Sequence, residues 1–237
     1  MRTSNLLLKL NLRMNTTAHR TMWKVSLPLL FLALIVCVPS RSMQASRSGF
    51  ATGTAPAAAQ QVIACGQTLT GNITAAGQQV TYTFSANTGE AVNIAAVATS
   101  GDLAARAELF SPSNTLIGAN GFGNTNTGSL TLPATGVYTI LVRDFNLNKT
   151  GNYALNLQFT TGRCGMAISC GETKTGRNLA SIAQQDTYTF SANAGEAVNI
   201  AAVATSGDLA ARLELYSPSN TLIGANGFGN TNTGSLT

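Results

Sequence analysis

Histidine and tryptophan are almost absent from this sequence, since each occurs once among 237 residues, as His19 and Trp23. Both precede residue 46, so the rest of the chain has no imidazole for a Ser-His-Asp site, a Cys-His site or a histidine metal site. The nine carboxylates are spread along the chain, and no spacing between them favours a paired-carboxylate site. The sequence therefore predicts a protein that is not an enzyme.

Acidic residues are missing from the start of the chain, where no Asp or Glu occurs before Glu90. The formal charge of +5 arises there, because from Ser46 onward 8 basic residues face 9 acidic ones. Lys and Arg form no cluster after Ser46 that would neutralise a row of phosphates. We predict no nucleic-acid partner.

Long apolar runs are also missing, apart from residues 27–38. This run follows Lys24 and precedes small residues, and it is shorter than the roughly 20 residues that span a bilayer. It is typical of a signal peptide, so we predict a leader over residues 1–45 and a secreted or cell-surface protein without membrane contact after cleavage. Two starts remain open, Met1 and Met22, as do three cleavage sites, after Ser40, Ser42 or Ala45.

An internal repeat defines the organisation of the remaining chain. Residues 78–131 and 184–237 align without a gap at an offset of 106 and differ at four positions: Val80/Asp186, Thr88/Ala194, Ala107/Leu213 and Phe110/Tyr216. We therefore predict a flexible linker at 46–61, a first domain at 62–164 and a second domain of the same fold at 165–237. The second domain lacks counterparts of residues 132–159, so we expect it to be incomplete and the chain to be part of a longer polypeptide.

Apolar residues alternate with polar ones at a period of 2 within each repeat, for example at Val80, Tyr82 and Phe84. This period predicts strands with one buried face, and turn sequences rich in Gly, Asn and Pro separate them. About seven or eight short strands in roughly 100 residues are typical of a sandwich. The predicted fold class is all-β, with tandem antiparallel, jelly-roll-like β-sandwiches.

Three cysteines remain after the leader, and export predicts that they are oxidised. Cys65 opens the first domain and Cys164 follows its last strand, which favours a Cys65–Cys164 disulfide because the first and last strands of a sandwich commonly lie together. Cys170 is then the counterpart of Cys65. A Cys164–Cys170 bond across the interdomain linker is the alternative.

The order of the sequence segments resembles that of a known family, the bacterial pre-peptidase C-terminal domain. The resemblance rests on a tyrosine strand and three later segments, at residues 81–90, 104–117, 132–142 and 151–157. It implies an accessory β-sandwich of the kind attached to secreted proteases and surface proteins, where such domains assist secretion or bind targets. The motifs are structural and imply no catalytic residue.

Two segments are candidate sites. Asp144, Asn146 and Asn148 present the alternating oxygen ligands that open a calcium loop, but Lys149 and Leu155 stand where that motif has Gly and Glu, and a hairpin turn explains the same residues. No other cofactor is predicted. The glycine-rich segment 118–128 and its repeat are a possible recognition loop through Phe122, Asn124, Phe228 and Asn230, the alternative being a loop without a binding role.

The leading functional hypothesis is a non-catalytic exported accessory protein that acts as a spacer, secretion aid or adhesion module. The second is a module that binds a polysaccharide or an extracellular matrix protein. The third is the accessory region of a secreted peptidase whose catalytic domain lies outside these residues.

Overall fold

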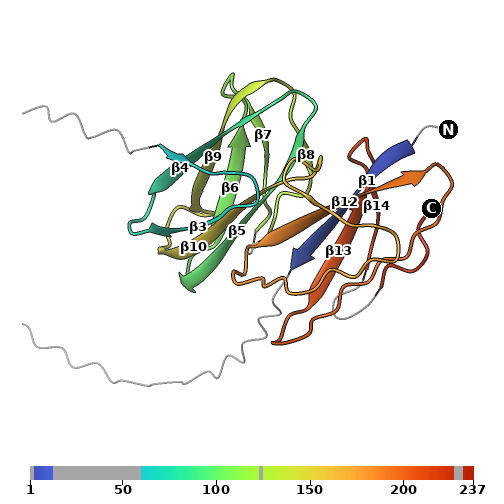
Figure 1. Ribbon diagram of the computed structural model, residues 1–237. Helices are drawn as coiled ribbons and strands as arrows, with labels where there is room; N and C mark the ends of the chain where they lie inside the picture. Colours follow the sequence, from blue (N-terminus) through green and yellow to red (C-terminus); the bar gives the residue numbers. More distant parts are fainter. Residues whose placement is uncertain (1–2, 13–59, 123–124, 227–231) are drawn as a thin grey trace, which may run out of the picture. The chain divides into compact units, whose positions relative to one another are not determined.

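The computed structural model describes residues 3–12, 60–122, 125–226 and 232–237, and its regular elements are all strands (Figure 1). Within those ranges no helix is long and apolar enough to cross a membrane. The all-β fold class predicted from the period of 2 is confirmed.

Residues 60–164, here called the first module, form two sheets. The first sheet has the order β2-β4-β9-β6-β7, and the second has the order β3-β10-β5-β8. All neighbouring strands are antiparallel except the short pair β2 and β4. The strands are β2 (Gln61–Val62), β3 (Thr68–Ile73), β4 (Gln79–Ala86), β5 (Ala91–Gly101), β6 (Ala105–Phe110), β7 (Leu116–Ala119), β8 (Leu130–Thr131), β9 (Gly136–Asp144) and β10 (Gly151–Phe159).

The core of the first module lies between these two sheets. Alternate residues of β6 and β9 are buried, as the period of 2 predicts for strands with one face on a core. Phe84 of one sheet packs edge-on against Phe159 of the other, with ring centroids 5.9 Å apart. The hydroxyls of Tyr82 and Tyr153 also meet across the layers, at 2.8 Å. These contacts establish a sandwich.

Residues 165–237, here called the second module, contribute four strands to a single five-stranded sheet. The order is β11-β12-β1-β13-β14, and the central strand comes from the beginning of the chain (Figure 1). The strands are β1 (Thr3–Leu12), β11 (Met166–Ala167), β12 (Gln185–Asn193), β13 (Ala211–Tyr216) and β14 (Leu222–Ala225).

The strand β1 takes the position that β9 has in the first module. In β9, Ile140 pairs with Tyr82 and Leu109. In β1, Leu8 pairs with Tyr188 and Leu215, which are the repeat counterparts of those two residues. The predicted leader, residues 1–45, therefore contains a ten-residue strand of the second module, while its apolar run at 27–38 and the predicted linker up to residue 59 lie outside the described residues.

The two repeats differ in their secondary structure at one segment. Residues 91–101 form β5, whereas residues 197–207 have the identical sequence and form only isolated bridges, at Val198 and Ala201. In the first module β5 pairs with β10 along its length. No described strand of the second module takes the place of β10, so the second sheet does not form there.

Candidate functional site

Asp144 organises the turn between β9 and β10. Its side chain is buried, with 1% of the residue exposed, and both carboxylate oxygens accept backbone hydrogen bonds. Oδ1 accepts from Ala104 at 3.0 Å, and Oδ2 accepts from Asn146, Asn148 and Lys149 at 3.1, 3.1 and 3.3 Å. Burial raises the pKa of this carboxyl, but the four N–H donors outweigh it and hold the pKa below its usual range.

The predicted calcium ligands belong to this turn. Asn146 and Asn148 are exposed, and each gives a backbone N–H to Asp144. Among the described residues no group of three or more His, Cys, Asp or Glu side chains is placed to hold a metal ion.

An aromatic pair joins the two candidate segments of the sequence. Phe145, directly after Asp144, meets Phe122 of the glycine-rich segment edge to face, with ring centroids 5.1 Å apart. The Arg106 guanidinium lies 5.0 Å from the centre of the Phe145 ring. Phe122 is 65% exposed. We call these three residues the Phe122 surface.

Charged neighbours hold Arg106 in place within this surface. Glu108 Oε1 accepts from Arg106 at 2.7 Å and from Arg143 at 2.8 Å. Burial raises the pKa of Glu108, but the two guanidinium groups outweigh it and lower the pKa. Arg143 also donates to the carbonyl of Phe145 at 2.8 Å, so the ion pairs fix the backbone of the aromatic turn.

Asn120 fixes the other side of the surface. This residue is buried, its Oδ1 accepts from the Ala107 N–H at 2.7 Å, and its Nδ2 donates to the carbonyls of Ala105 and Thr125. Asn120 therefore ties the start of the segment that carries Phe122 to β6, and it also binds Thr125 further along the segment.

The described residues of the second module repeat part of this support. Asn226 Oδ1 accepts from the Leu213 N–H, and Arg212 pairs with Glu214 at 3.1 Å. In the second module Asn11 of β1 pairs with Arg212. In the first module Arg143 of β9 pairs with Arg106, the counterpart of Arg212. Three predicted recognition residues lie outside the described ranges: Asn124, Phe228 and Asn230.

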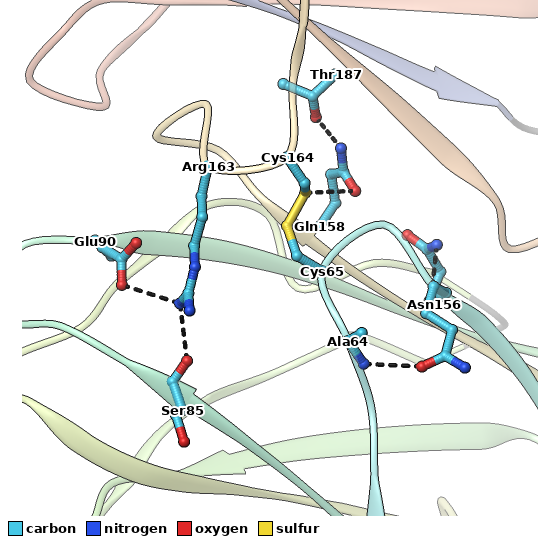
Figure 2. The surroundings of a disulfide bond; sticks show 10 residues. Ala64, Cys65, Ser85, Glu90, Asn156, Gln158, Arg163, Cys164 and Thr187 are labelled. Carbon is cyan, nitrogen blue, oxygen red and sulfur yellow. Dashed lines mark hydrogen bonds and ion pairs between the residues drawn. A yellow bond between two sulfur atoms is a disulfide. The ribbon is translucent and has the colours of Figure 1, made fainter.

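The disulfide of the first module joins Cys65 to Cys164, the first of the two pairings that the sequence left open (Figure 2). Cys170 is free and exposed. Figure 2 also shows Arg163, next to Cys164, which donates to the Ser85 carbonyl at 2.8 Å and pairs with Glu90 at 3.3 Å. The guanidinium of Arg163 lies over the ring of Phe159, 4.7 Å from its centre. The segment after β10 is thus fastened to both sheets.

Sequence reasoning missed Phe145 and Arg106. The available signal was local: Phe145 directly follows the Asp144 turn residue, and Arg106 lies between apolar positions of a predicted strand. Their contact depends on the pairing of β6 with β9, which places Arg106 opposite Arg143.

A scan of family models matches residues 79–144 to the bacterial pre-peptidase C-terminal domain. No curated protein matches the chain. Among solved structures, the pre-peptidase C-terminal domain of collagenase from Bacillus anthracis is 17% identical, covers 42% of this chain and 94% of its own, and has a TM-score of 0.36.

Two periplasmic inhibitors of g-type lysozyme, both called PliG, are also similar. The protein from Aeromonas hydrophila is 20% identical, covers 42% of this chain and 96% of its own, and has a TM-score of 0.34. The protein from Salmonella Typhimurium is 24% identical, covers 42% and 98%, and has a TM-score of 0.33.

Proposed function

We propose that the chain is a non-catalytic, exported accessory protein whose first module acts as an adhesion module through the Phe122 surface. The family match at residues 79–144 and the Cys65–Cys164 disulfide support an exported accessory β-sandwich. The buried carboxylates Asp144 and Asp186 are each held by structural partners, backbone N–H groups in one case and Arg177 in the other.

One observation carries the adhesion role, the exposed Phe122 ring against Phe145 and Arg106. Aromatic rings and arginine are enriched among the residues that dominate the binding energy of protein interfaces. A sugar ring or an apolar side chain that stacks on Phe122 would bury an aromatic ring that is now exposed. The ligand class is therefore an extracellular polysaccharide or a matrix protein, without a cofactor.

The role of a spacer or secretion aid is the alternative, and it needs no ligand. A further alternative is the accessory region of a secreted peptidase whose catalytic domain lies outside these residues. Both alternatives leave Phe122 without a function.

The test is retention on immobilised polysaccharides and matrix proteins, measured with and without calcium. We expect the wild-type chain to bind at least one member of the panel and Phe122→Ala to weaken that binding at least tenfold. Val137→Ala is the matched control, because Val137 is another exposed apolar residue of the first module, at 56% exposed. Retention that Phe122→Ala leaves unchanged, or no retention by the wild-type chain, would contradict the adhesion role.

A further inference from the structure

The Phe122 surface carries a positive charge that its one acidic neighbour does not fully neutralise. Glu108 accepts from Arg106 and from Arg143 through the same oxygen, Oε1. One carboxylate therefore faces two guanidinium groups, which leaves this cluster with a net charge of +1. The Arg106 side chain is 22% exposed, so part of this charge reaches solvent beside the Phe145 ring.

Two other acidic groups of the adjoining loops have partners of their own. The Asp144 carboxylate is buried and accepts four backbone N–H groups. Asp102, on the loop between β5 and β6, pairs with Lys149 at 3.9 Å. Both carboxylates are therefore already engaged, and among the described ion pairs neither is joined to Arg106 or Arg143.

Arg106 has donor groups left for a ligand. A guanidinium has five N–H groups. Nε of Arg106 donates to Glu108 at 2.7 Å, and Nη1 donates to the Asn120 carbonyl at 3.5 Å. Its remaining N–H groups have no acceptor among the residues that the structure describes. Because a guanidinium binds a carboxylate through two parallel hydrogen bonds, a carboxylate is the ligand group that fits this position.

The turn that follows Phe145 is mostly polar. Residues 146–150 are all exposed, and Leu147 is the one apolar residue among them. Asn146 and Asn148 use their backbone N–H groups for Asp144, and their side-chain amides belong to exposed residues. An amide both donates hydrogen bonds to hydroxyls and accepts them. This composition favours a ligand rich in hydroxyls, a polysaccharide, over a protein, because the centre of a protein interface is more apolar.

We infer, on the basis of the adhesion role proposed above, that the Phe122 surface binds a polyuronate, a polysaccharide with a carboxylate on each sugar. One sugar ring stacks on the exposed ring of Phe122. A carboxylate of the same sugar or of the next one binds Arg106, since Phe122 and Arg106 both contact Phe145. A matrix protein is the competing occupant.

The probe is polygalacturonate, and its methyl ester is the matched control polymer, because the two share a sugar backbone and differ in charge. Binding of the full chain to each immobilised polymer is measured in calcium-free buffer. We expect the affinity for polygalacturonate to be at least tenfold higher. We also expect that affinity to fall between about 0.05 M and about 0.5 M NaCl, while the affinity for the methyl ester changes little, since salt screens exposed charges.

Two variants separate the aromatic part of the surface from its charged part. Phe122→Ala is expected to weaken binding to both polymers, because both stack the same sugar ring. Arg106→Gln is expected to weaken binding to polygalacturonate at least tenfold and to remove most of the preference over the methyl ester. Urea unfolding checks that each variant is folded, and the comparison of the two polymers with the wild-type chain needs no variant.

Arg163→Gln is the matched control variant. Arg163 also lies over a phenylalanine ring, but it donates to Ser85 near the end of β4. Arg106 lies opposite Arg143, which pairs with Gln79 at the start of β4, so the two arginines are near opposite ends of this strand, about 20 Å apart. We expect Arg163→Gln to bind both polymers as the wild type does.

Equal affinity for the two polymers, or an Arg106→Gln variant that keeps the wild-type preference for polygalacturonate, would overturn the polyuronate as ligand. The adhesion role would survive that result as long as Phe122→Ala still weakens binding. Retention on a matrix protein but on neither polymer would assign the surface to a protein partner and would also overturn the polyuronate. Binding that Phe122→Ala leaves unchanged would contradict the adhesion role itself.

Discussion

The single carboxylate of Asp144 organises the turn between β9 and β10. One of its four backbone donors is Ala104, directly before β6, and the other three are residues that follow Asp144 in the turn. Hydrogen bonds to a charged acceptor stabilise more than neutral ones, about 1.5–3 kcal/mol each against roughly 1. The charge of Asp144 is therefore used to fold the turn that positions Phe145.

We expect Asp144→Ala to lower the free energy of unfolding at pH 7 by about 2–3 kcal/mol, because it leaves four backbone N–H groups without their charged acceptor. The folded pKa lies below the unfolded value of about 3.9, so this stabilisation is present above that value and is lost as pH falls through the folded pKa. Urea unfolding at pH 7 and at pH 2 measures both effects.

The control for this experiment is Asp102→Ala. The Asp102 side chain is 85% exposed and lies 3.9 Å from Lys149, an ion pair that contributes little in water. We expect this variant to stay within about 0.5 kcal/mol of the wild type. Equal losses for Asp102→Ala and Asp144→Ala, or a loss at Asp144 that does not shrink at acid pH, would show that the carboxylate is not the organising group.

The sequence pattern predicted part of this site. The acidic residue before two asparagines marked a turn, and Phe122 stood out as an aromatic in a glycine-rich segment. The pattern did not connect them, because Phe122 and Phe145 are 23 positions apart and meet only after β6 has paired with β9. The residue types in a sequence predict which chemical groups a loop carries. A contact between two loops that are distant in sequence can be predicted only when the register of the strands between them is known.

The strand β3 has a position where only glycine fits. Gly71 pairs with Tyr153 of β10, and a Cβ there would collide with the Tyr153 ring and with the Tyr82 hydroxyl. Both tyrosines are fully buried, so their rings have no space in which to move away. Burial, followed by the bond to Tyr82, raises the pKa of Tyr153, which keeps this hydroxyl neutral as a hydrogen-bonding group.

We expect Gly71→Ala to lower the free energy of unfolding by about 1–3 kcal/mol through overpacking. Thermal or urea unfolding of the first module measures it. Gly121→Ala is the control, since a Cβ at Gly121 meets its nearest neighbour, Thr125 Oγ1, at an ordinary 3.5 Å. If Gly71→Ala and Gly121→Ala have the same free energy of unfolding, β3 can move away from β10 with little loss of stability, and the overpacking prediction is wrong.

Residues 91–101 and 197–207 show why local sequence was insufficient for the second module. The two segments have the same eleven residues, and only the first forms a strand along its length. Strand propensity is largely packing against neighbours, and the neighbour here is β10. The period of 2 predicted the strands of the first module. Whether residues 197–207 of the second module form a strand depends on which strands lie beside them.

The two modules differ in how they are completed. The first takes all its strands from residues 60–164, while the sheet of the second includes a strand from the start of the chain. This strand lies within the predicted export leader, residues 1–45. Cleavage before residue 46 would therefore remove the central strand of the second module.

We expect a chain of residues 46–237 to show faster hydrogen exchange in β12 and β13 than the full chain, because the ladders from β1 to both strands are lost. The strands β4 and β6 of the first module are the internal control, since their shared neighbour β9 remains. Unchanged exchange in β12 and β13 would contradict a structural role for β1.

The Cys65–Cys164 bond has a mechanical consequence for a protein that is pulled by its ends. Its two cysteines are 99 positions apart in sequence. Tension that enters at Cys65 leaves at Cys164 through a single covalent bond, so the strands β3 to β10 carry none of the load. Roughly 350 Å of extended chain stays hidden until the bond is reduced, at about 3.5 Å per residue. We therefore expect residues 65–164 to resist extension while the bond is oxidised and to become extensible once it is reduced.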